Sequence, residues 1–309
     1  MKREILYTLK SPFRDDFKIQ GFRFGSGTKR VAIVGPMRGD EVQQQFVCSQ
    51  IVQALSRIEA AGELLPDQEI LVVPSANPFS MNIGSRFWAM DDTDINRMFP
   101  GYSKGETTQR IAAALFEQLQ GYQYGIQLAS YYLPGRFVPH VRMMETGYQD
   151  EETAGLFGLP YVCLRKPLPF DTTLLNYHWQ IWDTKAYSLY PGRTNTIDSD
   201  EAHLIVRSVV RFLNQVGVIR HKEIRSAFTS EVVQEKLFSL VKAPASGIFY
   251  DVRHVNEDVR KGDVLACILD PYDGSERARV VSPVDGVLFF AYDRPLTVQN
   301  TLLFQICSH

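Results

Sequence analysis

Apolar residues in the first two thirds of the chain follow two alternating patterns. Short apolar runs at 31–34 (VAIV) and 70–73 (ILVV) are typical of buried strands. Between them, apolar residues recur every three or four positions, which predicts an amphipathic helix that follows Glu41 and ends near Gly62. The apolar face of that helix consists of Phe46, Val47, Ile51, Ala54, Leu55 and Ile58.

The alternation of the two patterns continues to residue 216. Further helices are predicted at 107–120, with Thr108 as its cap, at 171–183 and at 201–216, and further strands at 124–128, 160–164 and 186–190. Strands that alternate with helices predict an α/β fold, in which helices cover both faces of a sheet.

The pattern changes from Leu237 onward to short strands broken by Gly and Pro, without a helical period. We therefore expect two domains, an α/β domain at 1–225 and an all-β domain at 226–309. Within the second domain, 243–249 (APASGIF) is repeated at 282–288 (SPVDGVL), and each copy is followed by an apolar run. The two copies indicate a small barrel of interleaved halves.

Composition and charge narrow the class of protein only slightly. A net charge of −2 gives no general reason to expect nucleic acid or an anionic membrane as a partner. The chain contains no apolar stretch of 18 residues and its N-terminus does not resemble a signal peptide, so we expect a cytoplasmic protein. The four cysteines show no C-x-x-C spacing, which argues against a disulfide framework or a cysteine-only zinc site.

Candidate chemistry lies where the first two buried strands end. The segment 31–41 (VAIVGPMRGDE) brings Arg38, Asp40 and Glu41 to the carboxyl end of a strand, the edge at which open α/β sheets bind ligands. The loop after 70–73 carries further polar residues, namely Asn77, Arg86, Asp94, Asn96 and Arg97.

The first of these segments, together with Asn77-Pro78, Asp94-Ile95-Asn96-Arg97 and Phe99-Pro100-Gly101, resembles the succinylglutamate desuccinylase and aspartoacylase family. The resemblance implies a carboxypeptidase-like mixed sheet flanked by helices, a zinc-dependent amide hydrolase activity, and a C-terminal domain similar to biotinyl or lipoyl carrier domains. In the family's first motif, G-x-H-G-D/N-E, the His and the Glu hold zinc.

Measured against that pattern, three positions of the family's catalytic set are altered. Arg38 stands where the first zinc-binding His is expected, Ala129 where a second His is expected, and Tyr190 where the general base Glu is expected. Glu41 is the one retained residue of ligand type. Because a guanidinium has no lone pair and stays charged, Arg38 cannot bind zinc.

We therefore expect no metal and no cofactor, although the family uses zinc. Arg38 is expected to pair with Glu41 or with a bound anion in a cleft; the alternative is a surface ion pair contributing about 1 kcal/mol or less. His140 and His178 lack the spacing of a metal site and are interpreted as structural.

The positions that grip the substrate carboxylate in the family are better kept. These positions are occupied by Arg86, Asn96 and Arg97, and planar guanidinium groups suit a bidentate carboxylate. The alternative is that both arginines are solvated loop residues. In the second domain, the tip expected to carry a cofactor, 270–274, contains no lysine, so we expect a structural or lid role.

Two main hypotheses follow. The first is a metal-free, catalytically impaired relative that binds a small acidic ligand, such as an N-acyl amino acid or a peptide terminus, alone, as a homo-oligomer or with an active paralogue. The second is an active amide hydrolase with an unusual zinc ligand set. A third, an interaction protein that uses its C-terminal domain, has less support.

Overall fold

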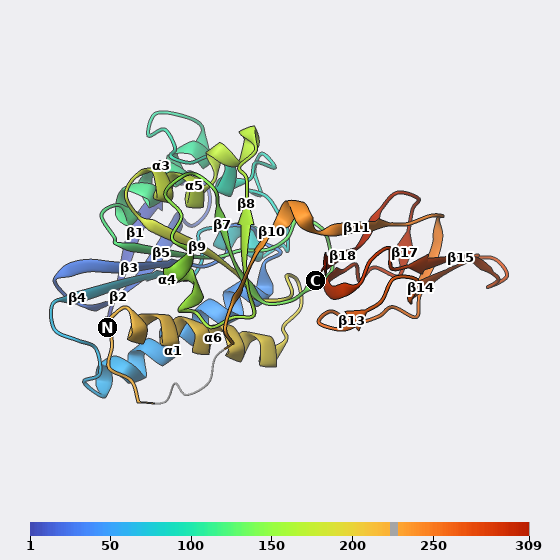
Figure 1. Ribbon diagram of the computed structural model, residues 1–309. Coiled ribbons are helices and arrows are strands. Elements are labelled where there is room, and N and C mark those ends of the chain that lie inside the picture. The colour runs from blue at the N-terminus through green and yellow to red at the C-terminus, as the bar shows by residue number, and fades with distance from the viewer. Residues whose placement is uncertain (223–227, 309) are drawn as a thin grey trace. The chain divides into compact units, whose positions relative to one another are not determined.

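The computed structural model describes residues 1–222 and 228–308 (Figure 1). The chain forms two compact units: unit 1 comprises Met1–Ser130 and Pro139–Val232, and unit 2 comprises Tyr131–Val138 and Val233–His309. The domain boundary expected between 225 and 226 lies in 223–227, outside the described residues. The short segment 131–138, which belongs to unit 2, was not anticipated from the sequence.

Unit 1 is built on a nine-stranded sheet with the order β1-β2-β4-β3-β5-β9-β7-β8-β10. Strands β3, β4, β5 and β9 run parallel, whereas β2 and β7 pair antiparallel with β4 and β9. The sheet is therefore mixed. The strands are β1 (Lys2–Leu9), β2 (Phe17–Gly25), β3 (Thr28–Val34), β4 (Gln68–Val73), β5 (Tyr124–Leu128), β7 (His140–Met144), β8 (Tyr161–Arg165), β9 (Lys185–Tyr190) and β10 (Glu231–Gln234).

Helices cover both faces of this sheet. Alternate residues of β3 enter different cores: Val31 and Ile33 pack with residues of α1 and α6, whereas Ala32 and Val34 pack with residues of α3 and α5. The mixed α/β class expected from the sequence is thereby confirmed. The helices are α1 (Val42–Ala60), α2 (Pro78–Met81), α3 (Thr107–Leu119), α4 (Glu151–Gly155), α5 (Leu175–Ile181) and α6 (Ser199–Gln215), with 3-10 turns η1 (Ile95–Arg97) and η2 (Pro169–Thr173).

Most predicted elements of unit 1 are present, and two details are wrong. The strand at 124–128 and the helix after Glu41 are confirmed, with Gly62 in a left-handed conformation beyond the helix end. Thr108 is not a cap: Glu106 occupies that position, and Thr108 is buried within α3. The helix expected at 171–183 is split into η2 and α5, because Leu174 between them has an extended backbone.

Unit 2 consists mainly of two antiparallel sheets. The first has the order β11-β18-β16-β13, and β6 pairs with β16; the second has the order β15-β14-β12-β17. The strands are β6 (Arg136–Phe137), β11 (Ser239–Lys242), β12 (Gly247–Tyr250), β13 (Asp258–Val259), β14 (Val264–Leu269), β15 (Glu276–Val281), β16 (Gly286–Ala291), β17 (Leu296–Thr297) and β18 (Leu302–Ser308), with the turn η3 (Glu235–Leu237). The two repeated segments contain the starts of β12 and β16, and the apolar runs that follow them form β14 and β18.

Segment 131–138 is part of the core of unit 2. The ring centroids of Tyr131 and Phe137 lie 4.8 Å apart, and the Phe137 side chain is fully buried. At Gly135, where φ is +155°, a Cβ atom would lie 2.6 Å from atoms of the Phe290 ring, so no larger residue fits. A two-residue strand has no periodicity, which explains why the pattern analysis missed β6.

No helix within the described residues is long and apolar enough to cross a bilayer.

Candidate functional site

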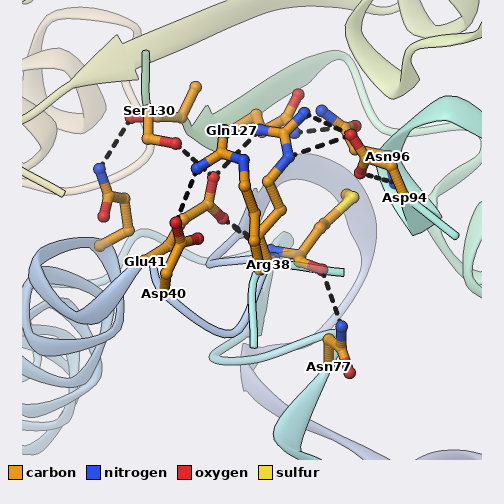
Figure 2. A network of polar contacts seen from close by, with 12 residues as sticks. Arg38, Asp40, Glu41, Asn77, Asp94, Asn96, Gln127 and Ser130 are labelled. Carbon is orange, nitrogen blue, oxygen red and sulfur yellow. Dashed lines mark hydrogen bonds and ion pairs between the residues drawn. The ribbon is translucent and has the colours of Figure 1, made fainter. Parts of the chain in front are cut away.

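Polar side chains gather at the carboxyl ends of the central parallel strands. Arg38, Asp40 and Glu41 lie between β3 and α1, Asp94 and Asn96 belong to η1 and its cap, and Gln127 and Ser130 lie at the end of β5 and just beyond it. Because β3 and β5 are parallel neighbours, their carboxyl ends meet at the same edge. Figure 2 shows the resulting network of hydrogen bonds and ion pairs.

Arg38 is the centre of this network. Its Nε and Nη2 donate to Oδ2 of Asp94 at 3.1 and 2.9 Å, and its Nη1 donates to Oε1 of Glu41 at 3.1 Å. Only 8% of the side chain is exposed, so this is not a surface ion pair. Burial acts to lower the pKa of the guanidinium, but the two carboxylates outweigh it and the pKa is raised above its usual value. Arg38 is therefore permanently cationic.

Glu41 is held by donors on every side. Its Oε2 accepts from the backbone N–H groups of Met37 and Arg38 at 3.0 and 3.2 Å, and its Oε1 also accepts from Oγ of Ser130 at 2.6 Å. The carboxylate is almost completely buried. Such saturation stabilises a buried negative charge, and it occupies the oxygen lone pairs that a metal ligand would use.

A second layer of amides fixes this arrangement. Oδ1 of Asp94 accepts from the backbone N–H of Asn96, and Oδ1 of Asn96 accepts from Nε2 of Gln127 at 3.1 Å. The Asn77 side chain donates to the carbonyl of Met37 at 3.2 Å and caps α2. Asp94 therefore orients both Arg38 and the backbone of Asn96.

The two other arginines differ in accessibility. Arg86 Nη1 pairs with Oδ2 of Asp40 at 2.8 Å, and its side chain is 19% exposed. Arg97 is 33% exposed; its Nε lies 3.6 Å from Oδ2 of Asp94, and its Nη1 donates to the carbonyl of Phe170, whose ring it also covers. Arg97 is therefore the more accessible cation.

Tyr190 ends β9, next to β5. Its hydroxyl accepts a hydrogen bond of 2.8 Å from Nη1 of Arg142, and its ring stacks on His140 at 4.7 Å. His140 is fully buried in β7, and His178 is buried in α5, where burial lowers its pKa. These contacts agree with packing roles for both histidines.

Sequence reasoning missed Gln127, Ser130 and Arg142. The sequence contains only a weak signal for two of them: Gln127 interrupts the apolar run of β5, and Ser130 follows it. Arg142 lies in a strand that was not predicted.

The residues at the family's zinc positions do not fit a zinc ion. Among residues 1–222 and 228–308, no group of three or more His, Cys, Asp or Glu could hold a metal. The Ala129 side chain offers no donor atom, and its carbonyl accepts from Nε2 of Gln44 at 3.0 Å. A cation, a methyl group and one carboxylate that is already hydrogen-bonded are not the three nitrogen or oxygen ligands that catalytic zinc requires.

Part of the chain matches a known protein family. Residues 27–130 match the succinylglutamate desuccinylase/aspartoacylase catalytic domain. The family resemblance is thereby confirmed. The matched segment contains Arg38, Glu41, the Asp-Ile-Asn-Arg run and Ala129. No curated protein matches the chain.

Several solved structures share the fold at low identity. A putative succinylglutamate desuccinylase/aspartoacylase from Shewanella frigidimarina NCIMB 400 is 18% identical with a TM-score of 0.79, over 100% of this chain and 96% of that one. The product-bound ectoine utilization protein EutE (DoeB) from Ruegeria pomeroyi is 17% identical with a TM-score of 0.77, over 95% and 90%. A succinylglutamate desuccinylase from Silicibacter sp. TM1040 is 16% identical with a TM-score of 0.79, over 99% and 94%.

Proposed function

We propose that this protein binds a small carboxylate ligand without a metal ion and is a catalytically impaired relative of the succinylglutamate desuccinylase/aspartoacylase family. One observation carries the proposal: the buried guanidinium of Arg38 lies between Glu41 and Asp94, at the motif position where the family has a zinc-binding His. A guanidinium fixed to the chain thus replaces a ligand of the exchangeable zinc ion that the family resemblance implies.

The same residues explain why hydrolysis is impaired. Attack on an amide needs a water molecule activated by a metal or by a general base. Arg38 offers N–H donors that can polarise a carbonyl, but it has no lone pair that could take a proton from water, and it cannot act as the Lewis acid that a metal ion is. Tyr190, at the expected position of the base, accepts a hydrogen bond from Arg142, and a phenol is a poorer general base than a carboxylate.

The groups that remain can hold an acid. A guanidinium has five N–H groups, and the three used by Arg38 for Asp94 and Glu41 leave two, one on each Nη, within the described part of the chain. Arg97 adds a second guanidinium that is only loosely paired with Asp94. Together with Asn96 and Arg86, these residues suit an N-acyl amino acid or a peptide terminus.

For unit 2 we propose a structural role in a barrel similar to biotinyl and lipoyl domains. Carriage of a cofactor requires a lysine at a hairpin tip. The turn between β14 and β15 instead reads Asp-Pro-Tyr-Asp-Gly-Ser at 270–275. Its Asp270 caps the turn by accepting from the Tyr272 backbone N–H.

Two measurements on the purified full chain test the proposal. Elemental analysis should find no stoichiometric zinc, and a thermal-shift screen of N-acetyl amino acids should raise Tm, because a ligand that binds only the folded state stabilises it by mass action. Arg97→Ala should abolish the shift. Arg253→Ala, which removes a half-exposed arginine of unit 2, should leave it unchanged.

Each measurement can refute the proposal. Stoichiometric zinc together with turnover of an N-acyl amino acid would establish the hydrolase hypothesis instead. If no acid raises Tm, the protein is not a carboxylate-binding relative.

A further inference from the structure

Helix α5 covers the sheet face that carries Gln127. A Cβ atom at Gly125 would lie 2.7 Å from ring atoms of Trp179, so the Trp179 ring rests directly on Gly125. Gln127 follows Gly125 by two positions in β5 and therefore points to the same face. Its register partner Ser188 in β9, and in turn Arg142 in β7, share this face.

These three residues form a polar row across the sheet (Gln127, Ser188 and Arg142), one step nearer the carboxyl edge than Gly125. Their chemistry is a carboxamide, a hydroxyl and a guanidinium. The core on this face is otherwise composed mainly of apolar side chains from α3, α5 and the central strands. Gln127 and Arg142 are paired there with Asn96 and Tyr190, so the row presents a polar surface within an otherwise apolar core.

Asn176 of α5 lies above this row. It precedes Trp179 by three positions and so shares its helix face. The turn after α5 leads into the amino end of β9, and the Thr184 N–H donates to the Trp179 carbonyl. The start of α5 must then lie toward the carboxyl end of the sheet, so Asn176 is displaced from Gly125 in the direction of Gln127 and Ser188.

The carboxamide of Asn176 lacks a hydrogen-bond partner among residues 1–222 and 228–308. The residue is 2% exposed, and within the described residues neither Oδ1 nor Nδ2 makes a hydrogen bond. A buried polar group without a partner destabilises the fold, whereas a leucine at this core position would carry no such cost. The neighbouring Leu175 packs in the same core without a penalty.

We propose that Asn176 recognises the amide group of a bound N-acyl amino acid and so determines which acids the site accepts. This inference rests on the function proposed above. An amide presents one N–H donor and one C=O acceptor, which match Oδ1 and Nδ2 of Asn176; a second carboxylate presents acceptors only and would leave Oδ1 unpaired. The ligand's own carboxylate is left to Arg38 and Arg97.

The test compares matched probes on the wild type and on Asn176→Leu, which has nearly the same volume. The probes are N-acetylglycine, N-acetylaspartate and N-acetylglutamate, each paired with the ketone analogue in which CH2 replaces the amide N–H, levulinate in the case of N-acetylglycine. The wild type should bind each amide about tenfold more tightly than its ketone, the value of one good hydrogen bond. Asn176→Leu should lose this preference, and it should bind the ketones more weakly than the wild type does, because the ketone C=O loses its donor Nδ2.

The stability of the ligand-free variant gives a second readout. Because the substitution removes an unpartnered amide, Asn176→Leu should raise Tm, by roughly 2–4 °C for a chain of this size. A lower Tm would mean that Asn176 has a structural partner, and an unchanged preference for the amide would mean that another group reads it; either result overturns this inference alone. If the wild type binds no probe at all, the proposed function fails and the inference fails with it.

Discussion

Replacing Arg38 by methionine removes the buried cation while keeping a side chain of similar length. The structure sets the size of the expected loss in the free energy of unfolding. Glu41 is 2% exposed and Asp94 8% exposed, so Glu41 would remain in the interior without a counter-charge and Asp94 would keep only Arg97, whose Nε lies 3.6 Å from its Oδ2, at a cost of about 3–5 kcal/mol. Glu41 would keep its hydrogen bonds from Ser130 and from two backbone N–H groups, which places the expected loss near the lower end of that range.

Urea denaturation followed by circular dichroism measures this loss as a change in the free energy of unfolding. Two further variants separate charge from shape. Arg38→Lys keeps the charge but lacks the planar fork, and should lose about half as much stability. The triple variant Arg38→Met/Glu41→Gln/Asp94→Asn removes all three buried charges of this cluster, and should recover most of the loss. A destabilisation below about 1 kcal/mol in Arg38→Met would refute the reasoning, because that is the value of an exposed ion pair.

Three other predictions concern separate features. Arg38→His/Ala129→His introduces the ligand types that the family resemblance implies beside Glu41. The purified double variant should contain zinc by elemental analysis, whereas the wild type should not. Gly125→Ala places a methyl group 2.7 Å from a tryptophan ring and should lower the free energy of unfolding by about 1–3 kcal/mol, whereas Gly155→Ala, with no atom within 4 Å of the new Cβ, should not. Burial acts to raise the pKa of Asp150, but hydrogen bonds from Lys185 and from Thr153 at the start of α4 outweigh it, so the pKa is lowered. The charge of Asp150 therefore stabilises the fold above about pH 4. This stabilisation disappears as the pH falls through the lowered pKa. Asp150→Asn should therefore cost about 1 kcal/mol at pH 7, and its thermal denaturation curve should approach that of the wild type near pH 3.

Local sequence was sufficient for the elements that frame the site. A run of four apolar residues followed by a three-to-four-residue period determines β3 and α1, because a buried strand and an amphipathic helix differ in their side-chain period. The same reasoning located β5. It did not locate β6 or the extended residue that divides 171–183, since both depend on contacts with distant segments.

Sequence alone determined that residue 38, where the family resemblance implies a histidine, is an arginine. That an arginine cannot bind zinc follows from the chemistry of its side chain and needs no coordinates. Only the tertiary structure decided which partners that arginine has. Arg38 and Asp94 are 56 positions apart, and they meet because the parallel order of β4, β3 and β5 brings loops from separate strands to one edge. The strand order and register also place Asn176, which is buried, above the polar row of Gln127, Ser188 and Arg142. Register sets the neighbours of each buried side chain, and no single segment of the sequence encodes it.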